Sequence, residues 1–531
     1  MALSGNMLIA GKWVKGQAGQ FNAYDPATGL ATATAFSKAD QQQVAAAVGA
    51  AHQAFLQYRH IPFSARADFL DDCAKAIMAL GDELLECMQQ ETGYPLARCM
   101  GERARTCGQL NMQADFIRSG EYLDARIDQA MPERQPLPRP DIRFLNQGIG
   151  VIAVFAVSNF PLAYSTAGGD TASALAAGCA VIVKGHMSHP GTGELVAQAL
   201  QTAAQRCGMP DGVISFIQAD DAIGGAALIN APQVKGIGFT GSIKGGTSIA
   251  KMAAQRPEPI PVFAEMGSIN PVLLLPQALK NRGSQIAQGF VASMTLGSGQ
   301  FCVNPGLLIA IEGPELDSFV AAVSEALKPS TAGVMLNQRI CQSYAEGTER
   351  LAATAGLQRL AEGQLPTQEA GYYAQAMLYA TQATTFLANH SLQEEVFGPA
   401  TLLVKCADIQ QVMTVLHSLQ GQLTGTLQGE ESELAEHKQL VDLLSLKVGR
   451  MVINGFPTGV EVCSAMVHGG PFPASTDSRF TAVGTAALQR WLRPVCYQDF
   501  PQSLLPEALQ NHNPLGLMRT VNGHKTRDSI V

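Results

Sequence analysis

A regular alternation of short apolar segments with helical segments begins at residue 150 and limits the fold more than any other feature. Five apolar segments are predicted strands, at 151–157, 180–184, 213–217, 235–239 and 261–265. Strands that alternate with helices in this way form a parallel sheet with helices on both faces. We therefore predict an α/β fold with a doubly wound parallel sheet, in which ligands bind at the carboxyl ends of the strands.

Further helices and strands are predicted outside residues 150–265. A second α/β unit is predicted, with strands near 271–275, 306–311, 376–380, 400–405, 422–427 and 447–453. Before the first strand, residues 36–58 and 64–92 have the spacing of amphipathic helices, with Ser37 and Ser64 as N-caps. The proline-rich residues 130–141 must be extended, and the polar segment after 478 is too poor in apolar periodicity to form its own core.

Composition excludes several classes of protein. The net charge is −8, and no run of Lys or Arg is present to neutralise a phosphate backbone, so a nucleic-acid binder is not expected. The 11 cysteines contain no C-x-x-C pair, which indicates a reducing compartment. No secretory signal and no membrane span is recognisable, so we expect a soluble, cytoplasmic protein.

One cysteine lies where a nucleophile would be expected. Cys302 belongs to the glycine-rich segment GSGQFCVNPG, residues 297–306, between a predicted helix and a predicted strand. Glycines allow a close approach to the backbone, and Pro305-Gly306 favours a turn, so the sulfur can be open to a substrate. The alternative is that Cys302 is a small buried hydrophobic residue, as most free cysteines are.

Two polar residues at strand ends suit the same chemistry. Asn159 follows the first strand, and its amide could donate to a developing oxyanion, although a buried asparagine more often caps a turn. Glu265 ends the fifth strand among apolar residues, where partial burial would raise its pKa toward that of a useful base. The alternative for Glu265 is an ion pair at a strand terminus.

Other strand ends suggest a nucleotide site. Lys184 ends the second strand and could contact ribose hydroxyls or a phosphate, although such a lysine often only reaches solvent. The turn FTGSIKGG, residues 239–246, could present helix N-terminal amides to a dinucleotide, or it could be an ordinary tight turn. His186 and His189 are three residues apart but lack further partners with ligand spacing, so no metal is predicted.

Taken together, these segments resemble one known family. The chain carries SNFP at 158–161, KGH at 184–186, FTGS at 239–242, EMGS at 265–268, GQFC at 299–302 and EEVFGP at 394–399. In order and spacing, over nearly the whole chain, this set resembles the aldehyde dehydrogenase superfamily.

The resemblance implies oxidation of an aldehyde to a carboxylate with a nicotinamide cofactor. Cys302 would attack the aldehyde and pass through a thiohemiacetal and a thioester. The amide of Asn159 and the backbone N–H of Cys302 would stabilise the oxyanion, and Glu265 would activate the hydrolytic water. The expected cofactor-binding residues are Lys184, Phe239, Gly241, Ser242, Gly246, Glu395 and Phe397.

A departure from the family pattern concerns the cofactor. Many members that prefer NAD carry a glutamate three residues after the strand-two lysine, whereas this chain has Met187, followed by Ser188. A 2′-phosphate can then lie beside Lys184 and near His186. We expect NADP to be preferred, with NAD also accepted.

Further segments indicate the substrate. ERARTCGQL at 102–110, PERQPLP at 132–138, GGDTASAL at 168–175 and RPVCY at 493–497 resemble the branch that oxidises α-ketoglutarate semialdehyde, 2,5-dioxopentanoate. Its carboxylate needs a cation, for which Arg103 or Arg105 is the candidate. A surface ion pair is the alternative role for these arginines. The alternative substrate class is long-chain fatty aldehydes, oxidised with NADP.

The resemblance also implies a division of the chain. Residues 1–130 and 150–265 would form the NAD(P)-binding domain, and residues 266–477 the catalytic domain. Residues 131–149 and 478–531 would join subunits in a homodimer or homotetramer. Two other classes are compatible with parts of the sequence: an inactive protein on the same scaffold, and a thiol hydrolase that needs no cofactor.

Overall fold

The first of two large sheets confirms the predicted parallel architecture. In the computed structural model, which describes residues 3–367 and 370–530, this sheet has the strand order β11-β10-β7-β8-β9-β1-β2. The strands from β7 to β11 are parallel, and β1 joins β9 antiparallel. Their bounds are β1 Met7–Ile9, β2 Lys12–Val14, β7 Val151–Phe155, β8 Ala180–Lys184, β9 Ile214–Ile217, β10 Val234–Thr240 and β11 Val262–Glu265.

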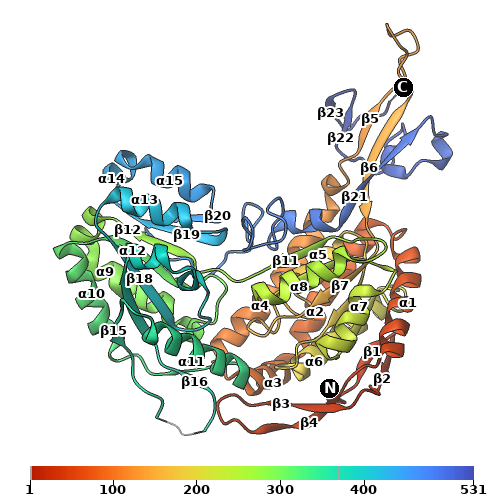
Figure 1. Ribbon diagram of the computed structural model, residues 1–531. Coiled ribbons are helices and arrows are strands. Elements are labelled where there is room, and N and C mark those ends of the chain that lie inside the picture. The colour runs from red at the N-terminus through yellow and green to blue at the C-terminus, as the bar shows by residue number, and fades with distance from the viewer. Residues whose placement is uncertain (1–2, 368–369, 531) are drawn as a thin grey trace.

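Helices cover both faces of this sheet, because alternate strand residues point to opposite sides. Ile152 and Val154 pack in one apolar cluster with α2, α4, α5 and α6, whereas Val151 and Ala153 pack in another with α1, α7 and α8. Figure 1 shows these helices around the strands. The helices are α1 Gln41–Tyr58, α2 Phe63–Ala79, α3 Gly81–Thr92, α4 Leu96–Arg118, α5 Gly169–Ala176, α6 Pro190–Arg206, α7 Ala226–Asn230 and α8 Ile243–Ala254.

The N-terminal helix predictions need correction. Residues 31–37 form strand β4 (Ala31–Ser37), paired with β3 (Gln20–Tyr24), so the helix predicted from residue 36 begins only at Gln41. Its N-cap is Asp40, not Ser37. The segment 64–92 is two helices, which meet where Gly81 has a φ of 60°. Ser64 lies inside α2 and caps nothing.

The second sheet has the order β15-β17-β18-β13-β12-β19-β20. All six predicted strands are present, and the sequence missed β15, a partly exposed edge strand antiparallel to β17. The strands are β12 Pro271–Leu274, β13 Leu307–Ile311, β15 Leu357–Glu362, β17 Met377–Gln382, β18 Ala400–Cys406, β19 Gln422–Gln428 and β20 Val448–Ile453. The helices are α9 Pro276–Thr295, α10 Pro314–Leu327, α11 Gln338–Ala353, α12 Ala383–Ala388, α13 Ile409–Ser418, α14 Glu431–Glu436 and α15 Lys438–Ser445.

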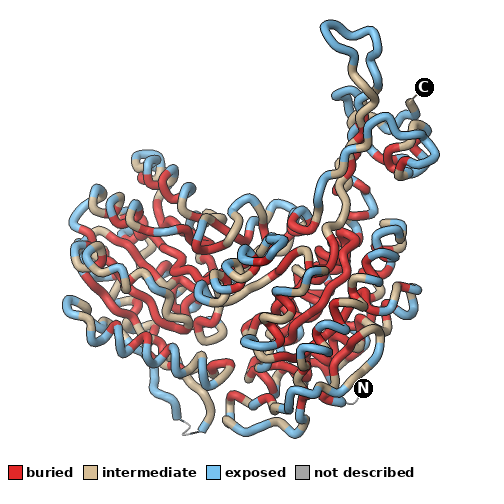
Figure 2. Tube along the Cα trace, turned by 45° about the vertical axis from the view of Figure 1, so that its right-hand side comes forward, coloured by how far each residue is buried: buried red, intermediate tan, exposed pale blue. Residues whose placement is uncertain are grey.

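A third sheet stands away from the two lobes (Figure 1). Its order is β21-β6-β5-β22-β23, with β5 Arg126–Asp128, β6 Ile142–Gly148, β21 Leu492–Gln498, β22 Arg519–Val521 and β23 His524–Thr526. The C-terminal segment therefore does take part in a small core, which includes Ile127, Leu145 and Leu509. The proline-rich turn between β5 and β6 is mostly exposed (Figure 2).

These sheets place the predicted site residues at one junction. β11 ends at Glu265 in the first sheet, and β12 of the second sheet begins at Pro271. The short connection brings the carboxyl end of the first sheet against the second lobe. Among the described residues, no helix combines the length and the apolar character needed to cross a bilayer.

Candidate active site

Cys302 follows a turn that only a glycine-rich sequence can make. Residues 297–299 all have positive φ, and a Cβ on Gly299 would overlap the backbone of Gly398. Beyond the turn, the side-chain amide of Asn270 donates to the carbonyl of Cys302, with Nδ2 2.9 Å from the oxygen. The loop therefore fixes the position of the sulfur.

Two buried side chains meet the sulfur of Cys302. His468 Nε2 lies 3.4 Å from Cys302 Sγ and 2.9 Å from Glu265 Oε1. Glu265 is 4 % exposed and His468 2 %. The backbone N–H of His468 donates to the hydroxyl of Thr481, which fixes the histidine. The same imidazole nitrogen thus faces both the thiol and the carboxylate.

The surroundings set the charge of this cluster. Burial raises the pKa of the Cys302 thiol well above its usual value, and the carboxylate of Glu265 raises it further. Burial also acts to raise the pKa of Glu265, but the contacts with His468 and the thiol outweigh it and leave this pKa below its ordinary value. The resting state is therefore a neutral thiol beside an ionised carboxylate.

Asn159 is held against the loop that carries Cys302. Its side-chain Nδ2 donates to the carbonyl of Gln300 at 2.9 Å. The backbone carbonyl of Asn159 accepts from the Tyr94 hydroxyl at 2.9 Å and from the Arg98 guanidinium at 3.0 Å. An asparagine amide has two N–H donors, so one remains for a group bound beside the cysteine.

Lys184 ends β8 with its ammonium group held in place. The residue is 8 % exposed, and its Nζ lies 2.6 Å from Asp221 Oδ1. Asp221 begins a π-helical turn, Asp221–Gly225, which follows β9. The carboxyl end of β8 therefore carries a buried cation whose partner, the carboxylate of Asp221, is exposed to solvent.

The turn before α8 is a capped helix N-terminus. The hydroxyl of Ser242 accepts from the N–H of Gly245 at 3.1 Å and so caps the helix. A Cβ on Gly246 would overlap Met266, and one on Gly241 would overlap the ring of Phe239, so a larger residue at either position would displace these side chains. These glycines let the helix N-terminus, which favours phosphate, pack close to the strand ends.

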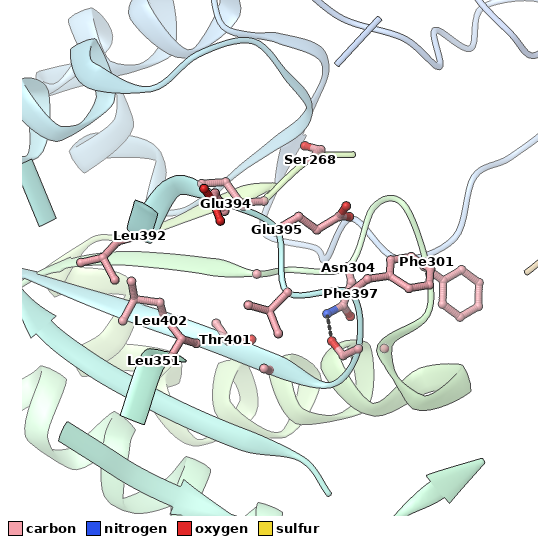
Figure 3. A pocket seen from close by; sticks show the side chains of 16 residues that line it. Ser268, Phe301, Asn304, Leu351, Leu392, Glu394, Glu395, Phe397, Thr401 and Leu402 are labelled. Carbon is pink, nitrogen blue, oxygen red and sulfur yellow. Dashed lines mark hydrogen bonds between the residues drawn. The ribbon is translucent and has the colours of Figure 1, made fainter. Parts of the chain in front are cut away.

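A pocket lies beside the cysteine loop (Figure 3). Glu395, Phe397 and Phe301 are among the residues that line it. In Figure 3 the side chains of Glu394 and Glu395 point in different directions. Burial raises the pKa of Glu395 to about 7, partly offset by the N–H of Ser268. The two residues predicted for the nicotinamide end are thus next to the predicted nucleophile.

The two candidate arginines on α4 have different surroundings. Arg105 donates to the hydroxyl of Tyr164 at 3.1 Å, and the Tyr164 ring centroid is 6.1 Å from that of His468. Arg103 instead donates to the carbonyl of Gly81 at 2.7 Å, at the start of α3. The structure therefore brings Arg105 toward the cysteine and does not bring Arg103 there.

His468 was missed in the sequence, where its only signal is a histidine directly before Gly469-Gly470-Pro471. Among the described residues, the one group with geometry suited to a metal ion is Glu265, Cys302 and His468, and it does not include His186 or His189. His189 donates from Nε2 to the carbonyl of Val157 at 2.7 Å, a structural bond. Burial lowers the pKa of both His186 and His189.

Comparisons with known proteins identify the family of this chain. A sequence model described as "Aldehyde dehydrogenase family" matches residues 13–491. "Alpha-ketoglutaric semialdehyde dehydrogenase 2" of Azospirillum brasilense is 50 % identical over 98 % of this chain and 99 % of its own. "Alpha-ketoglutaric semialdehyde dehydrogenase" of Acinetobacter baylyi is 46 % identical over 99 % of each chain. In fold, the chain resembles 1-pyrroline-5-carboxylate dehydrogenase from Thermus with bound NAD, with a TM-score of 0.78 and 21 % identity over 93 % of this chain and 92 % of that chain.

Proposed function

Because this chain belongs to the aldehyde dehydrogenase family, we propose that it oxidises α-ketoglutarate semialdehyde to α-ketoglutarate with a nicotinamide dinucleotide. The observation that carries the chemistry is the convergence of Cys302, His468 and Glu265 at the junction of the two sheets. The substrate is supported by the names of two relatives that are 50 % and 46 % identical to this chain over nearly its full length.

The first step forms a carbon–sulfur bond. The thiol of Cys302 loses its proton to solvent, and the N–H of His468 Nε2, which lies 3.4 Å from the sulfur and 2.9 Å from Glu265 Oε1, donates to the thiolate. The sulfur then attacks the aldehyde carbon, and negative charge develops on the aldehyde oxygen. The free N–H of Asn159 and the backbone N–H of Cys302 donate to this oxygen.

In the second half of the reaction, a thioester forms on Cys302 and is then hydrolysed. A bound nicotinamide supplies the acceptor for the hydride. Glu395 and Phe397 hold the nicotinamide ribose and ring, and Lys184 holds the adenosine ribose. Glu265 takes a proton from water, the water oxygen attacks the thioester carbon, and the carbon–sulfur bond breaks to release the carboxylate.

For the cofactor, we propose NADP, with NAD accepted as well. Support comes from Met187, three residues after the buried Lys184, at the position where many NAD-preferring members carry a glutamate. At the substrate end, we assign the carboxylate of the semialdehyde to Arg105. Its guanidinium lies over the rings of Phe160 and Tyr164, at 5.6 Å and 5.4 Å from their centroids.

The proposed division of labour follows the sheets. We assign nucleotide binding to residues 1–130 and 150–265, catalysis to 266–477, and subunit contacts to 131–149 and 478–531. A homodimer or homotetramer is supported by exposed apolar side chains on the third sheet and its turn, such as Leu137 at 69 % exposure and Leu504 at 67 %.

The test compares kcat/KM for 2,5-dioxopentanoate with kcat/KM for decanal, each with NADP. We expect the semialdehyde to be favoured at least about a hundredfold, because a substrate without a carboxylate cannot make the charge-assisted contact with the half-buried guanidinium of Arg105. A higher value for decanal would favour the fatty-aldehyde alternative. Turnover of ester without formation of reduced cofactor from aldehyde would favour the thiol hydrolase.

A further inference from the structure

The carboxylate of Asp221 lies on the solvent side of the lysine assigned to the cofactor. The side chain of Asp221 is 84 % exposed, whereas that of Lys184 is 9 % exposed. The turn that begins at Asp221 packs on the lysine, since a Cβ on Gly225 would be 3.8 Å from Lys184 Cε. A nucleotide that reaches Lys184 from solvent therefore meets Asp221 as well.

The neighbouring histidine does not offset this negative charge. Burial lowers the pKa of His186 well below its usual value, and the nearby His189 and Lys184 lower it further. His186 is therefore neutral at physiological pH. Lys184 is then shared between Asp221 and any phosphate that binds there.

We propose that Asp221 sets the preference between NAD and NADP at Lys184. Its carboxylate can accept hydrogen bonds from the ribose hydroxyls of NAD, and it repels the 2′-phosphate of NADP. Position 187 carries no negative charge, and Asp221, on the turn after β9, supplies one instead. This charge limits the preference for NADP. The inference rests on the proposed placement of the adenosine ribose at Lys184.

The test measures binding of two nucleotide fragments by calorimetry, adenosine 2′,5′-bisphosphate and 5′-AMP. For Asp221→Asn we expect the bisphosphate to bind about five- to tenfold more tightly, because one charge is removed beside its 2′-phosphate. Binding of 5′-AMP should be unchanged or weaker. The ratio of kcat/KM for NADP to that for NAD should rise by a similar factor.

The chain offers a matched control one residue away. Asp220→Asn removes the same charge, but Asp220 pairs with Lys38, at 2.9 Å, and not with Lys184. This variant should leave the ratio of the two affinities unchanged. If Asp220→Asn shifts the ratio as far as Asp221→Asn does, or if Asp221→Asn leaves it unchanged, the inference is wrong.

A third variant separates this inference from the proposed function. Lys184→Met should weaken binding of both fragments if the adenosine ribose lies at Lys184. If it weakens both while Asp221→Asn has no effect on their ratio, only the role of Asp221 fails. If Lys184→Met changes neither affinity, the placement of the cofactor itself is wrong, and the role of Asp221 fails with it.

Discussion

At the residue scale, the surroundings of Cys302 favour a neutral thiol. Burial raises its pKa, and the negative charges of Glu265 and Glu395 raise it further. A neutral thiol is a weak nucleophile and a poor target for oxidation. The N–H of His468 Nε2 is nevertheless within 3.4 Å of the sulfur and can donate to the thiolate once it forms, so activation needs no large movement of the chain.

This environment predicts a change in reactivity when the charge of Glu265 is removed. In Glu265→Gln the pKa of Cys302 should fall, because a neutral amide no longer opposes the thiolate. At a pH below both pKa values, a fall of one unit gives about tenfold more thiolate. We expect alkylation by iodoacetamide to rise with pH in both proteins, with the midpoint of the variant at lower pH.

The control for this measurement is Glu394→Gln. Glu394 is the neighbour of Glu395, but its side chain is 63 % exposed and pairs with Arg350 at 3.3 Å. Its alkylation profile should match that of the unchanged protein. A midpoint for Glu265→Gln that stays in place or moves to higher pH would show that the carboxylate does not set the thiol pKa.

At the element scale, helix α4 contacts the loop that carries Asn159 and also carries Arg105, the residue proposed for the substrate carboxylate. Arg98 donates to the carbonyl of Asn159, and the buried carboxylate of Glu102 accepts from the backbone N–H groups of Leu162 and Ala163. Arg105, one turn further along, reaches Tyr164. One helix thus fixes the loop after β7 and presents a cation beside it.

Two arginines of α4 provide a paired prediction. Arg105→Met should raise KM for 2,5-dioxopentanoate about tenfold or more and leave kcat/KM for a short neutral aldehyde nearly unchanged, because a charge-assisted contact to the carboxylate is lost. Arg103→Met, whose guanidinium contacts Gly81 instead, should leave both steady-state constants unchanged. An equal loss in the two variants would exclude Arg105 as the specific contact.

The sequence was most informative for the strands that are buried on both faces. β8 has the bounds that the apolar segment 180–184 indicates, because a strand inside a parallel sheet carries a continuous apolar run. Prediction failed where contacts between residues distant in the sequence determine the secondary structure. β15 lies at a partly exposed edge, where apolar alternation is weak. The cap of α1 was missed for a different reason: Gln43, three residues after Asp40, forms a capping box with it, a local signal that favours Asp40 over Ser37.

The same reasoning explains which site residues were predicted. Four predicted residues lie at strand ends or on a glycine-rich turn, which the apolar pattern of the sequence locates: Asn159, Lys184, Glu265 and Cys302. His468 lies between β20 and β21, in a long segment that contains no assigned helix or strand before residue 485, so no local pattern points to it. Only the three-dimensional path of that segment brings the imidazole to the cysteine.

At the scale of the whole molecule, the third sheet leaves apolar surface exposed. Seven residue pairs join β21 to β6, so the C-terminal segment and the arm form one unit. Its own core is small, and Met131, Phe500 and Leu504 are exposed on it. Another copy of the chain is the partner that we propose for this surface.

The arm therefore predicts a change in assembly. Leu137→Asp should lower the molecular mass of the particle measured by analytical ultracentrifugation, because a charge is placed in an apolar contact between subunits. Leu446→Asp, at a position that is 73 % exposed but far along the chain on the second lobe, should leave the mass unchanged. Identical masses for Leu137→Asp and the unchanged protein would contradict a role for this turn in assembly.

The proposed function depends on the transfer of the substrate's acyl group to Cys302. It is tested most directly by mass spectrometry of the Glu265→Gln protein after addition of 2,5-dioxopentanoate and NADP. We predict an acyl adduct on the peptide that contains Cys302, formed only when both compounds are present, because hydrolysis of the thioester is slowed in this variant. Absence of the adduct, or an adduct on another cysteine, would contradict the account.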